Sequence, residues 1–335
     1  MAVLALDLLS REKLLKWTNT REGETKVGQQ IGLLSPDVDI EIQLRQFGGS
    51  YCLLGIPEDI GPRANAGKGG AEKMFADFLG YFCNMQHNEF LDATAILLLG
   101  SVKTSDLTKK AAGETDVHLL RDLVNELDNR VFPIIEQVVA AGKIPIVIGG
   151  GHNNAYPLLK GSYLGLGKTP LGCINIDPHA DLRQLEGRHS GNGFSYAIAN
   201  GYLDKYHPIG LHQNYNNQYI WDKLKSDQQL FRFITNEDIL DNDLSLNSIA
   251  SKTLKFFKDM PVGLEIDIDG IRFAESSAKT PVGFSENKVR KLMRLLTGNK
   301  NIVYLNLSEG IPSPNYQTGK LLAYLVSDFI RVTSL

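Results

Sequence analysis

Residues 174–181 read Ile174-Asn175-Ile176-Asp177-Pro178-His179-Ala180-Asp181. A short β-branched run of this kind is typical of a buried strand, and Asp and His are residue types that bind metal ions. In extended backbone, residues two positions apart point to the same side. We therefore expect Asp177, His179 and Asp181 to converge on one point at the carboxyl end of a strand.

Two further clusters have the same form. His152 follows the apolar run 146–148 and three glycines, and Asp267 and Asp269 close the run that starts at residue 263. In open α/β sheets, ligands bind in the crevice beyond the carboxyl ends of the strands. A lone Asp-x-Asp or a lone His is usually structural, but three such clusters, each closing an apolar run, favour a shared metal site.

The ligand set is too large for one small cation. It holds two imidazoles and four carboxylates, namely His152, Asp177, His179, Asp181, Asp267 and Asp269. Such a set suits two cations with carboxylates bridging them, and its many oxygens favour Mn²⁺ over zinc or copper. Two metals about 3.5–4 Å apart share and acidify a bridging water, so the pattern predicts a hydrolase.

Composition excludes several classes of protein. The chain has 43% hydrophobic and 22% charged residues and a formal net charge of −3, with Lys and Arg scattered, so we expect no nucleic-acid partner. No apolar run approaches the length of about 20 residues that spans a bilayer, so we expect no membrane partner. An amino terminus without a basic start and three cysteines without a pattern predict a cytoplasmic protein.

Eight short apolar runs recur at wide spacing, with helical patterns between them. They are residues 50–56, 94–99, 144–148, 172–176, 208–211, 230–234, 262–268 and 302–307. Apolar side chains at helical spacing predict helices over residues 116–141, 285–296 and 320–332. This alternation predicts a three-layer α/β fold with a doubly wound, mostly parallel, eight-stranded sheet.

The chain shows no internal repeat and no Pro/Gly/Ser-rich linker. We therefore predict a single domain over residues 1–335. Residues 1–45 are expected to form a helical N-terminal extension that packs on it.

The three clusters resemble the signatures of the arginase–agmatinase–formimidoylglutamase family, the ureohydrolases. Those signatures run Gly-Gly-(Asp/Gly)-His, Asp-x-His-x-Asp and Asp-x-Asp, and all three occur here in that order. The resemblance implies an arginase-like fold, a homo-oligomer and two Mn²⁺ per chain. It also assigns the ligands. One metal would be held by His152, Asp177, Asp181 and Asp267, and the other by Asp177, His179, Asp267 and Asp269.

The resemblance also assigns a residue that binds the substrate. The family carries a Glu in a Glu-x-x-Pro context that pairs with the amidinium group, and Glu309-Gly310-Ile311-Pro312 matches it directly after the run 302–307. The implied partner is therefore a small amidine or guanidine. Asp181 would orient the metal-bound hydroxide and relay its proton.

Within the family, several details resemble formimidoylglutamases. Arg183 follows Asp181-Leu182, and residues 189–194 (His-Ser-Gly-Asn-Gly-Phe) resemble a loop of the same branch. A guanidinium grips a carboxylate with two parallel hydrogen bonds, so Arg183 suits a glutamate-type substrate. The implied reaction converts N-formimidoyl-L-glutamate and water to L-glutamate and formamide, in histidine degradation. Asn192 in this loop and Arg272 after Asp269 are further expected substrate contacts.

One departure leaves the general acid open between Asp181 and His189. Ser190 stands where agmatinases and arginases have a proton-shuttling His, and His189 lies one residue earlier. Structural alternatives remain for the outer residues: Arg183 pairing with a carboxylate such as Glu186, Arg272 in an ion pair, and His189 as an incidental loop residue.

Three other functions stay open. A ureohydrolase of the agmatinase, arginase or guanidinobutyrase type would release urea from a guanidine, although agmatine has no carboxylate for Arg183. A single-zinc deacetylase would leave several ligands unused. A non-catalytic metal-binding relative would have no need of Glu309.

Overall fold

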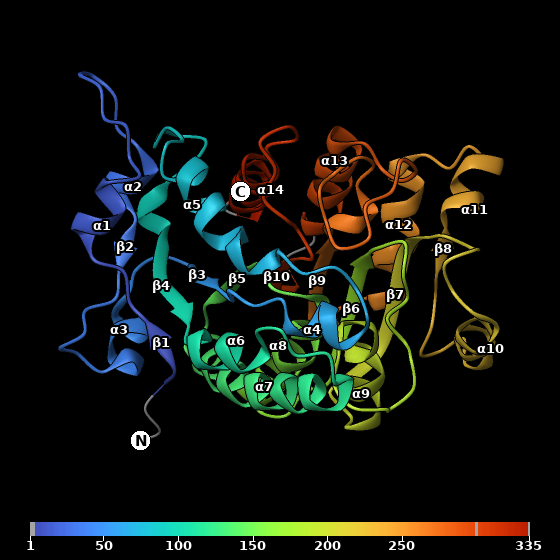
Figure 1. The fold of residues 1–335 in the computed structure, drawn as a ribbon. Helices are drawn as coiled ribbons and strands as arrows, with labels where there is room; N and C mark the ends of the chain where they lie inside the picture. Colours follow the sequence, from blue (N-terminus) through green and yellow to red (C-terminus); the bar gives the residue numbers. More distant parts are fainter. Residues whose placement is uncertain (1–3, 299–300, 334–335) are drawn as a thin grey trace.

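The computed structural model describes residues 4–298 and 301–333 and contains a ten-stranded sheet (Figure 1). The strands run in the order β1-β4-β3-β5-β10-β9-β6-β7-β8, with β2 also beside β4. Their bounds are β1 Leu6–Asp7, β2 Gly32–Leu33, β3 Tyr51–Gly55, β4 Ile96–Val102, β5 Ile144–Ile148, β6 Leu171–Ile176, β7 Leu203–Leu211, β8 Ile234–Thr235, β9 Val262–Asp267 and β10 Ile302–Ser308. The pair β1/β4 is antiparallel and the other described pairs are parallel.

Helices cover both faces of the sheet, as the alternation of strands and helices predicts (Figure 1). The helices are α1 Arg11–Leu15, α2 Val27–Gln30, α3 Ile40–Gln46, α4 Ile60–Ala64, α5 Met74–Phe82, α6 Ser105–Ala111, α7 Val117–Ala140, α8 Ala155–Gly165, α9 Gly193–Ala199, α10 Gln218–Ser226, α11 Asn236–Asp241, α12 Leu246–Phe257, α13 Glu286–Thr297 and α14 Thr318–Thr333. The expected helices over 116–141, 285–296 and 320–332 are α7, α13 and α14.

Two clusters of buried apolar side chains join these layers. One joins α5, α12, α13 and α14 to the sheet, and the other joins α4, α6, α7, α8 and α9 to the opposite face. Ile146 and Ile148 in β5 belong to the first cluster and Val147 to the second. Strands buried on both faces need apolar side chains at successive positions, and this explains their continuous apolar runs. The prediction of a three-layer, mostly parallel sheet is confirmed.

The N-terminal segment differs from the expected helical extension. Besides α1 and α2, and α3 at its end, it contains β1 and β2, which pair with β4. Seven of the eight expected strands correspond to β3–β7, β9 and β10, the expected run 230–234 overlaps β8 only at Ile234, and β1 and β2 are additional. Strands of two residues have no periodicity that a sequence pattern could reveal. Residues 1–3 of the expected extension lie outside the described residues.

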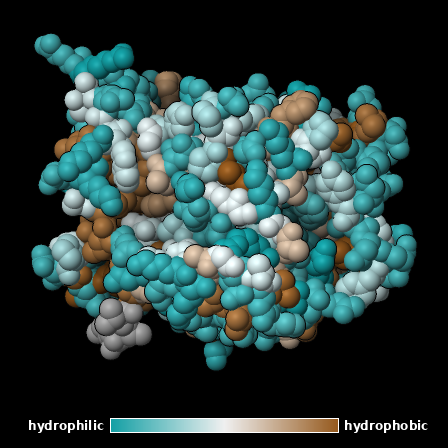
Figure 2. All heavy atoms as spheres, viewed as in Figure 1, coloured by the Kyte–Doolittle hydropathy of each residue, from teal (hydrophilic) through white to brown (hydrophobic). Residues whose placement is uncertain are grey.

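Most of the face drawn in Figure 2 is hydrophilic. Apolar side chains gather at the left of the view, where Figure 1 places the N-terminal segment. Large apolar side chains of this segment are partly exposed, with exposed fractions of 39% for Leu8 and 45% for Val38. Among the described helices, none combines the length and the hydropathy needed to cross a bilayer.

The centre of the sheet brings four strand ends together. β5, β10, β9 and β6 are consecutive neighbours and parallel, so their carboxyl ends lie at one edge of the sheet. The segments that follow them hold His152, Glu309, Asp269 and the 177–181 motif, and Asp267 is the last residue of β9. The fold therefore places all three predicted clusters and Glu309 at the same edge.

A buried histidine in β7 predicts a pH dependence of stability. The ring of His207 lies beside Phe256 and Phe257, and neither ring nitrogen has a hydrogen bond of normal geometry with the described residues. Burial lowers the pKa of His207 to about 3, against a smaller upward effect of the Arg232 backbone. The unfolded chain binds this proton below about pH 6.5, so stability falls as the pH drops from about 6.5 towards 3.

We therefore expect His207→Phe to reduce the loss of stability in acid. Between about pH 7.5 and about pH 5, His207 accounts for a loss of about 2 kcal/mol in the free energy of unfolding. Urea unfolding of both chains with a chelator present measures this difference. An equal loss in the two chains would contradict the prediction.

Candidate metal centre

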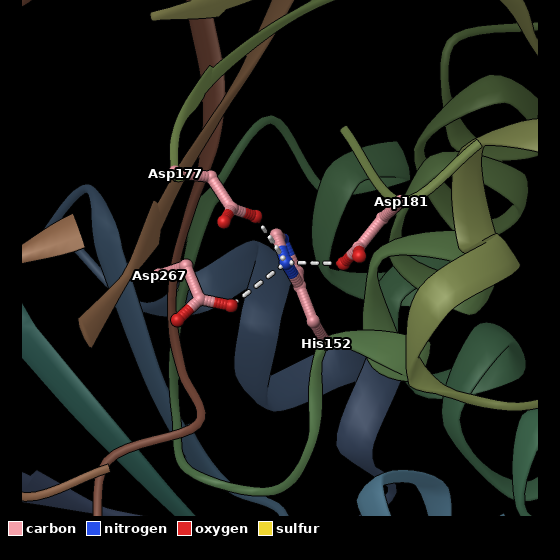
Figure 3. Close-up of side chains that lie close together, drawn as sticks. All are labelled: His152, Asp177, Asp181 and Asp267. Atoms are coloured by element: carbon pink, nitrogen blue, oxygen red, sulfur yellow. Dashed lines mark ion pairs between the residues drawn. The ribbon is translucent and has the colours of Figure 1, made fainter. Parts of the chain in front are cut away.

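His152 and three aspartates surround one point at the carboxyl edge of the sheet (Figure 3). The Nδ1 atom of His152 lies 3.1 Å from Oδ2 of Asp177, 2.9 Å from Oδ2 of Asp181 and 3.0 Å from Oδ2 of Asp267. One ligand atom from each of the four residues lies within 4.8 Å of the others. These four residues are the set expected to hold the first metal.

The remaining two predicted ligands form a second group beside the first. Nδ1 of His179 lies 3.5 Å from Oδ1 of Asp177 and 3.7 Å from Oδ2 of Asp269. Asp177 joins the two groups, because its Oδ2 faces His152 and its Oδ1 faces His179. The His179 ring stacks on Tyr215, with 5.4 Å between ring centroids, and this contact fixes the plane of the imidazole.

The charges around His152 favour a bound cation between the four side chains over a single proton on the imidazole. Burial and the charges of Asp269 and Asp177 raise the pKa of Asp267 well above its usual range. Burial alone would lower the pKa of His152, but its carboxylate neighbours raise it. An N–H on Nδ1 can point at only one acceptor, and no aligned hydrogen bond forms there although three carboxylate oxygens surround the atom. A divalent cation is the species that such a donor set fits.

A buried glutamate fixes the loop that carries His152. Oε1 of Glu58 accepts hydrogen bonds from the backbone N–H of Gly151 at 2.7 Å and from the Asn154 amide at 2.8 Å. Gly150 adopts the left-handed backbone, with φ of 74°. A Cβ at this position would lie 2.5 Å from the Asn154 amide nitrogen and 2.7 Å from Glu58 Oε1. The loop therefore needs glycine at residue 150.

Two non-glycine residues of the site also have left-handed backbone. Asp181 has φ of 48° and Glu309 has φ of 62°. Such conformations cost energy and persist where surrounding contacts impose them. For Glu309, the backbone N–H donates to the Gly150 carbonyl at 3.0 Å, and Oε1 accepts from the backbone N–H of His152 at 2.7 Å. These two bonds direct the Glu309 carboxylate into the site.

The second oxygen of Glu309 remains available to a ligand. Oε2 is buried and accepts no hydrogen bond of normal geometry from the described residues. Burial and the charge of Asp269 raise the pKa of Glu309 to about 8, against the nearby Ser277 hydroxyl and the His152 backbone N–H. A cationic ligand would favour the charged carboxylate in this position.

A cavity of about 630 Å³ opens onto these groups. Its walls hold six of the residues predicted from the sequence, namely His179, Asp181, Arg183, Asp267, Asp269 and Glu309. The exposed side chain of Arg183 makes no hydrogen bond or ion pair within the described part of the chain. Oε1 of Glu186, the carboxylate considered as an alternative partner of Arg183, lies instead 3.8 Å from Nη2 of Arg121 and 3.2 Å from Nε2 of His189. The Arg183 guanidinium is thus free to meet a ligand.

The structure does not bring His189 to the cavity wall. The side chain is fully buried, and Nδ1 accepts a hydrogen bond from the backbone N–H of Gly191 at 3.1 Å. Nε2 lies 3.2 Å from Oε1 of Glu186. Burial lowers the pKa of His189 to about 4, so the ring is neutral near pH 7. These contacts indicate a residue that orders the loop, and they favour Asp181 over His189 as the proton donor that the sequence left open.

The expected substrate contacts Asn192 and Arg272 also lie outside the cavity wall. Asn192 is buried, and its side chain accepts from Arg188 and donates to the carbonyls of Gln184 and Gly187. All its hydrogen-bonding groups are therefore used within the fold. Arg272 is exposed and does not line the cavity. Loop position alone did not reveal where either side chain points.

Other residues of the site were not anticipated. Tyr215 and Ser277 line the cavity, and Glu58 and Glu265 lie buried behind it. The signal for Glu265 was present, because a charged residue stands inside the apolar run of β9. Tyr215 lies in a polar loop without a pattern, so the sequence offered no sign of its contact with His179.

Comparisons with known proteins show the family and agree with the fold. A family model described as the arginase family matches residues 51–331. A formimidoylglutamase of Streptococcus pyogenes serotype M12 is 28% identical over 222 residues, and the match covers 62% of this chain and 65% of that protein. The structure of formimidoylglutamase from Bacillus subtilis has a TM-score of 0.76 at 14% identity, with 94% of each chain covered. Trypanosoma cruzi formiminoglutamase with Mn²⁺ has a TM-score of 0.72 at 17% identity, with 92% of this chain and 97% of that one covered.

We expect alanine at Gly149 and alanine at Gly150 to differ in their effects on stability and on metal binding. Gly149 and Gly150 both have left-handed backbone, so alanine at either position costs about 1–2 kcal/mol of folding free energy. A Cβ at residue 149 meets ordinary contacts at 3.5 Å or more, whereas one at residue 150 overlaps Glu58 and Asn154. We expect Gly150→Ala to be the more destabilising and to weaken metal binding as well.

Urea unfolding and Mn²⁺ titration of both variants test this prediction. Gly149→Ala is the matched control for backbone strain. Equal losses of stability and metal affinity in the two variants would contradict the prediction that a Cβ at residue 150 displaces Glu58 and Asn154.

Proposed function

Because this chain belongs to the arginase family, we propose that it is a metal-dependent hydrolase of C–N bonds in linear amidines, and specifically a formimidoylglutamase. The observation that carries this proposal is the pairing of groups in one cavity. Glu309 offers a free carboxylate oxygen at its base, and Arg183 offers a free guanidinium on its wall. A substrate with an amidinium or guanidinium at one end and a carboxylate at the other matches both groups, and agmatine does not. The likeness of Arg183 and residues 189–194 to formimidoylglutamases, together with the formimidoylglutamase relatives, favours the amidine.

Two Mn²⁺ ions per chain fit the donor set. His152, Asp177, Asp181 and Asp267 would hold one ion, and Asp177, His179, Asp267 and Asp269 the other. The ions would supply an acidified bridging water, which is the nucleophile that an amidine carbon requires near pH 7. The crowding of four aspartates around two imidazoles supports this assignment, because their charges need compensation where water is excluded.

Glu309 fixes the reacting carbon. Its Oε1 is held by the His152 backbone, so Oε2 is directed by the fold and can accept a charge-assisted hydrogen bond from the planar amidinium. Such a bond places the carbon above the metal ligands before the reaction begins. The cationic substrate in turn stabilises the ionised form of Glu309, which burial disfavours.

Asp181 is the residue that we propose to move the proton. Its carboxylate belongs to the first metal group and also lines the cavity, so it would be within reach of both a metal-bound water and a substrate in the cavity. It would accept a proton from the attacking water and deliver it to the leaving nitrogen, giving glutamate and formamide. His189 lies enclosed behind the wall and has a structural role in this proposal.

Substrate specificity is tested with the Mn²⁺-loaded protein and four compounds: N-formimidoyl-L-glutamate, arginine, agmatine and guanidinobutyrate. We expect formamide and glutamate from the first compound. Urea from any of the other three would contradict the amidine assignment and favour a guanidine hydrolase. Mn²⁺ binding without turnover of any of the four would contradict the proposed substrate class.

Arg183→Ala tests the carboxylate contact. Loss of a charge-assisted bond costs about 1.5–3 kcal/mol, which corresponds to a fall of roughly 10- to 150-fold in kcat/KM, mainly through KM. Arg272→Ala is the matched control, because it removes an exposed arginine outside the cavity wall. Equal effects of the two substitutions would contradict the assignment to Arg183.

The proton path is tested with Asp181→Asn and His189→Asn. Loss of a positioned acid–base group lowers kcat by about 10²–10⁴-fold, so we expect at least this effect from Asp181→Asn, which also removes a metal ligand. His189→Asn keeps a side chain able to cap the 190–192 turn and should retain most of its turnover. A large loss of kcat in His189→Asn, with metal content and unfolding midpoint unchanged, would place His189 in the proton path.

A further inference from the structure

β9 carries a fully buried carboxylate beneath the metal ligands. Glu265 lies two residues before Asp267 and is opposite Asn306 of β10 and Asn175 of β6 in the sheet. The Tyr304 hydroxyl donates to Oε1 of Glu265 at 2.7 Å, and the Asn306 amide donates to Oε2 at 2.6 Å. Burying a carboxylate costs several kcal/mol in proteins unless charge and hydrogen bonds compensate it, so this residue needs an explanation.

Hydrogen bonds from two neutral groups do not balance the charge. No Lys or Arg in the described part of the chain forms an ion pair with Glu265. The nearest group able to carry positive charge is the His152 ring, whose Nε2 atom lies 3.6 Å from Oε2 of Glu265, at an ion-pair distance and without a hydrogen bond between the two atoms. The same ring presents Nδ1 to Asp177, Asp181 and Asp267 on its other side. His152 therefore lies between Glu265 and the proposed metal.

From this placement we propose that Glu265 is the positioning residue for His152, and that it sets the affinity of the metal that His152 holds. The negative charge of Glu265 beside Nε2 favours the tautomer with the ring proton on that atom, which would leave the lone pair of Nδ1 available to the metal. It also fixes the ring orientation and makes the ligand a stronger base. The proposal rests on the metal centre of the proposed function but is independent of the substrate.

The second imidazole provides an internal comparison. Both close carboxylate contacts of His179 use Nδ1, and its ring is held by stacking on Tyr215. No buried carboxylate faces its other nitrogen in the described part of the chain. The proposal therefore predicts an asymmetric effect, in which a change at Glu265 weakens the metal on His152 and leaves the metal on His179 nearly unaffected.

The test is a Mn²⁺ titration of the full chain against a competing chelator, with free Mn²⁺ read by electron paramagnetic resonance. We expect Glu265→Gln to weaken one of the two Mn²⁺ by about 10- to 100-fold, which is the usual effect of losing such a partner. Tyr304→Phe is the matched control, because it removes the donor to Oε1 and leaves the Oε2 side intact. Thermal unfolding with chelator present compares the folds of the metal-free chains.

Each outcome decides the proposal. Two Mn²⁺ bound by Glu265→Gln with the affinities of the parent would overturn it, and so would equal weakening of both ions or an equal effect of Tyr304→Phe. A parent chain that binds no Mn²⁺ would overturn the metal centre itself. If Glu265→Gln fails to fold, the shorter Glu265→Asp keeps the charge but withdraws it from Nε2, and it should weaken the same single ion.

Discussion

Three carboxylate oxygens face one imidazole nitrogen at hydrogen-bond distance, and this concentration of acceptors is the constraint on which the rest of the site depends. Like charges at this spacing repel strongly where water is excluded. Side chains free to move would separate. They stay together because they follow two neighbouring central strands, Asp177 and Asp181 after β6 and Asp267 at the end of β9, and the hydrogen bonds of the parallel sheet fix the backbone of both strands. The sheet therefore holds the three carboxylates close enough together to bind one cation.

A second layer of buried polar groups holds the loops that follow those strands. Glu58 anchors the segment before His152, and Arg188 anchors the 189–192 turn. Arg188 pairs with Asp128 of α7 at 2.8 Å and donates to the Asn153 carbonyl at 2.7 Å. These bonds join α7, the 189–192 turn and the loop after β5 that carries His152. Breaking a buried pair of this kind usually costs several kcal/mol, so the arrangement constrains much of this face.

The sequence predicted those features that local patterns determine. Runs of buried residues identified β3–β7, β9 and β10, and the short spacing of Asp177, His179 and Asp181 after β6 and of Asp267 and Asp269 after β9 predicted that these residues lie at one edge of the sheet. The extended backbone assumed for them is absent, because β6 ends at Ile176, Asp181 has φ of 48° and Asp269 lies in the 3-10 turn 268–270. Features that depend on distant contacts were not predicted. The directions of the His189 and Asn192 side chains depend on hydrogen bonds made after the loop folds, and the pairing of β1 and β2 depends on β4. Glu265 could be predicted in part. Its charge stands out in an apolar run, but its neighbour His152 lies 113 positions away in the sequence and could not be inferred from local pattern.

The short strands of the N-terminal segment have a consequence for the behaviour of the chain in solution. β1 and β2 occupy the outer side of β4 at residues 101–102 and 97–98. Gly100 allows this approach, since a Cβ there would lie 2.2 Å from the Asp7 carbonyl oxygen. A shortened chain without this segment would leave unpaired N–H and C=O groups on a hydrophobic edge strand, which is a template for aggregation. β1 and β2 therefore cover the part of β4 that could otherwise pair with another chain, and we expect them to keep the protein from aggregating.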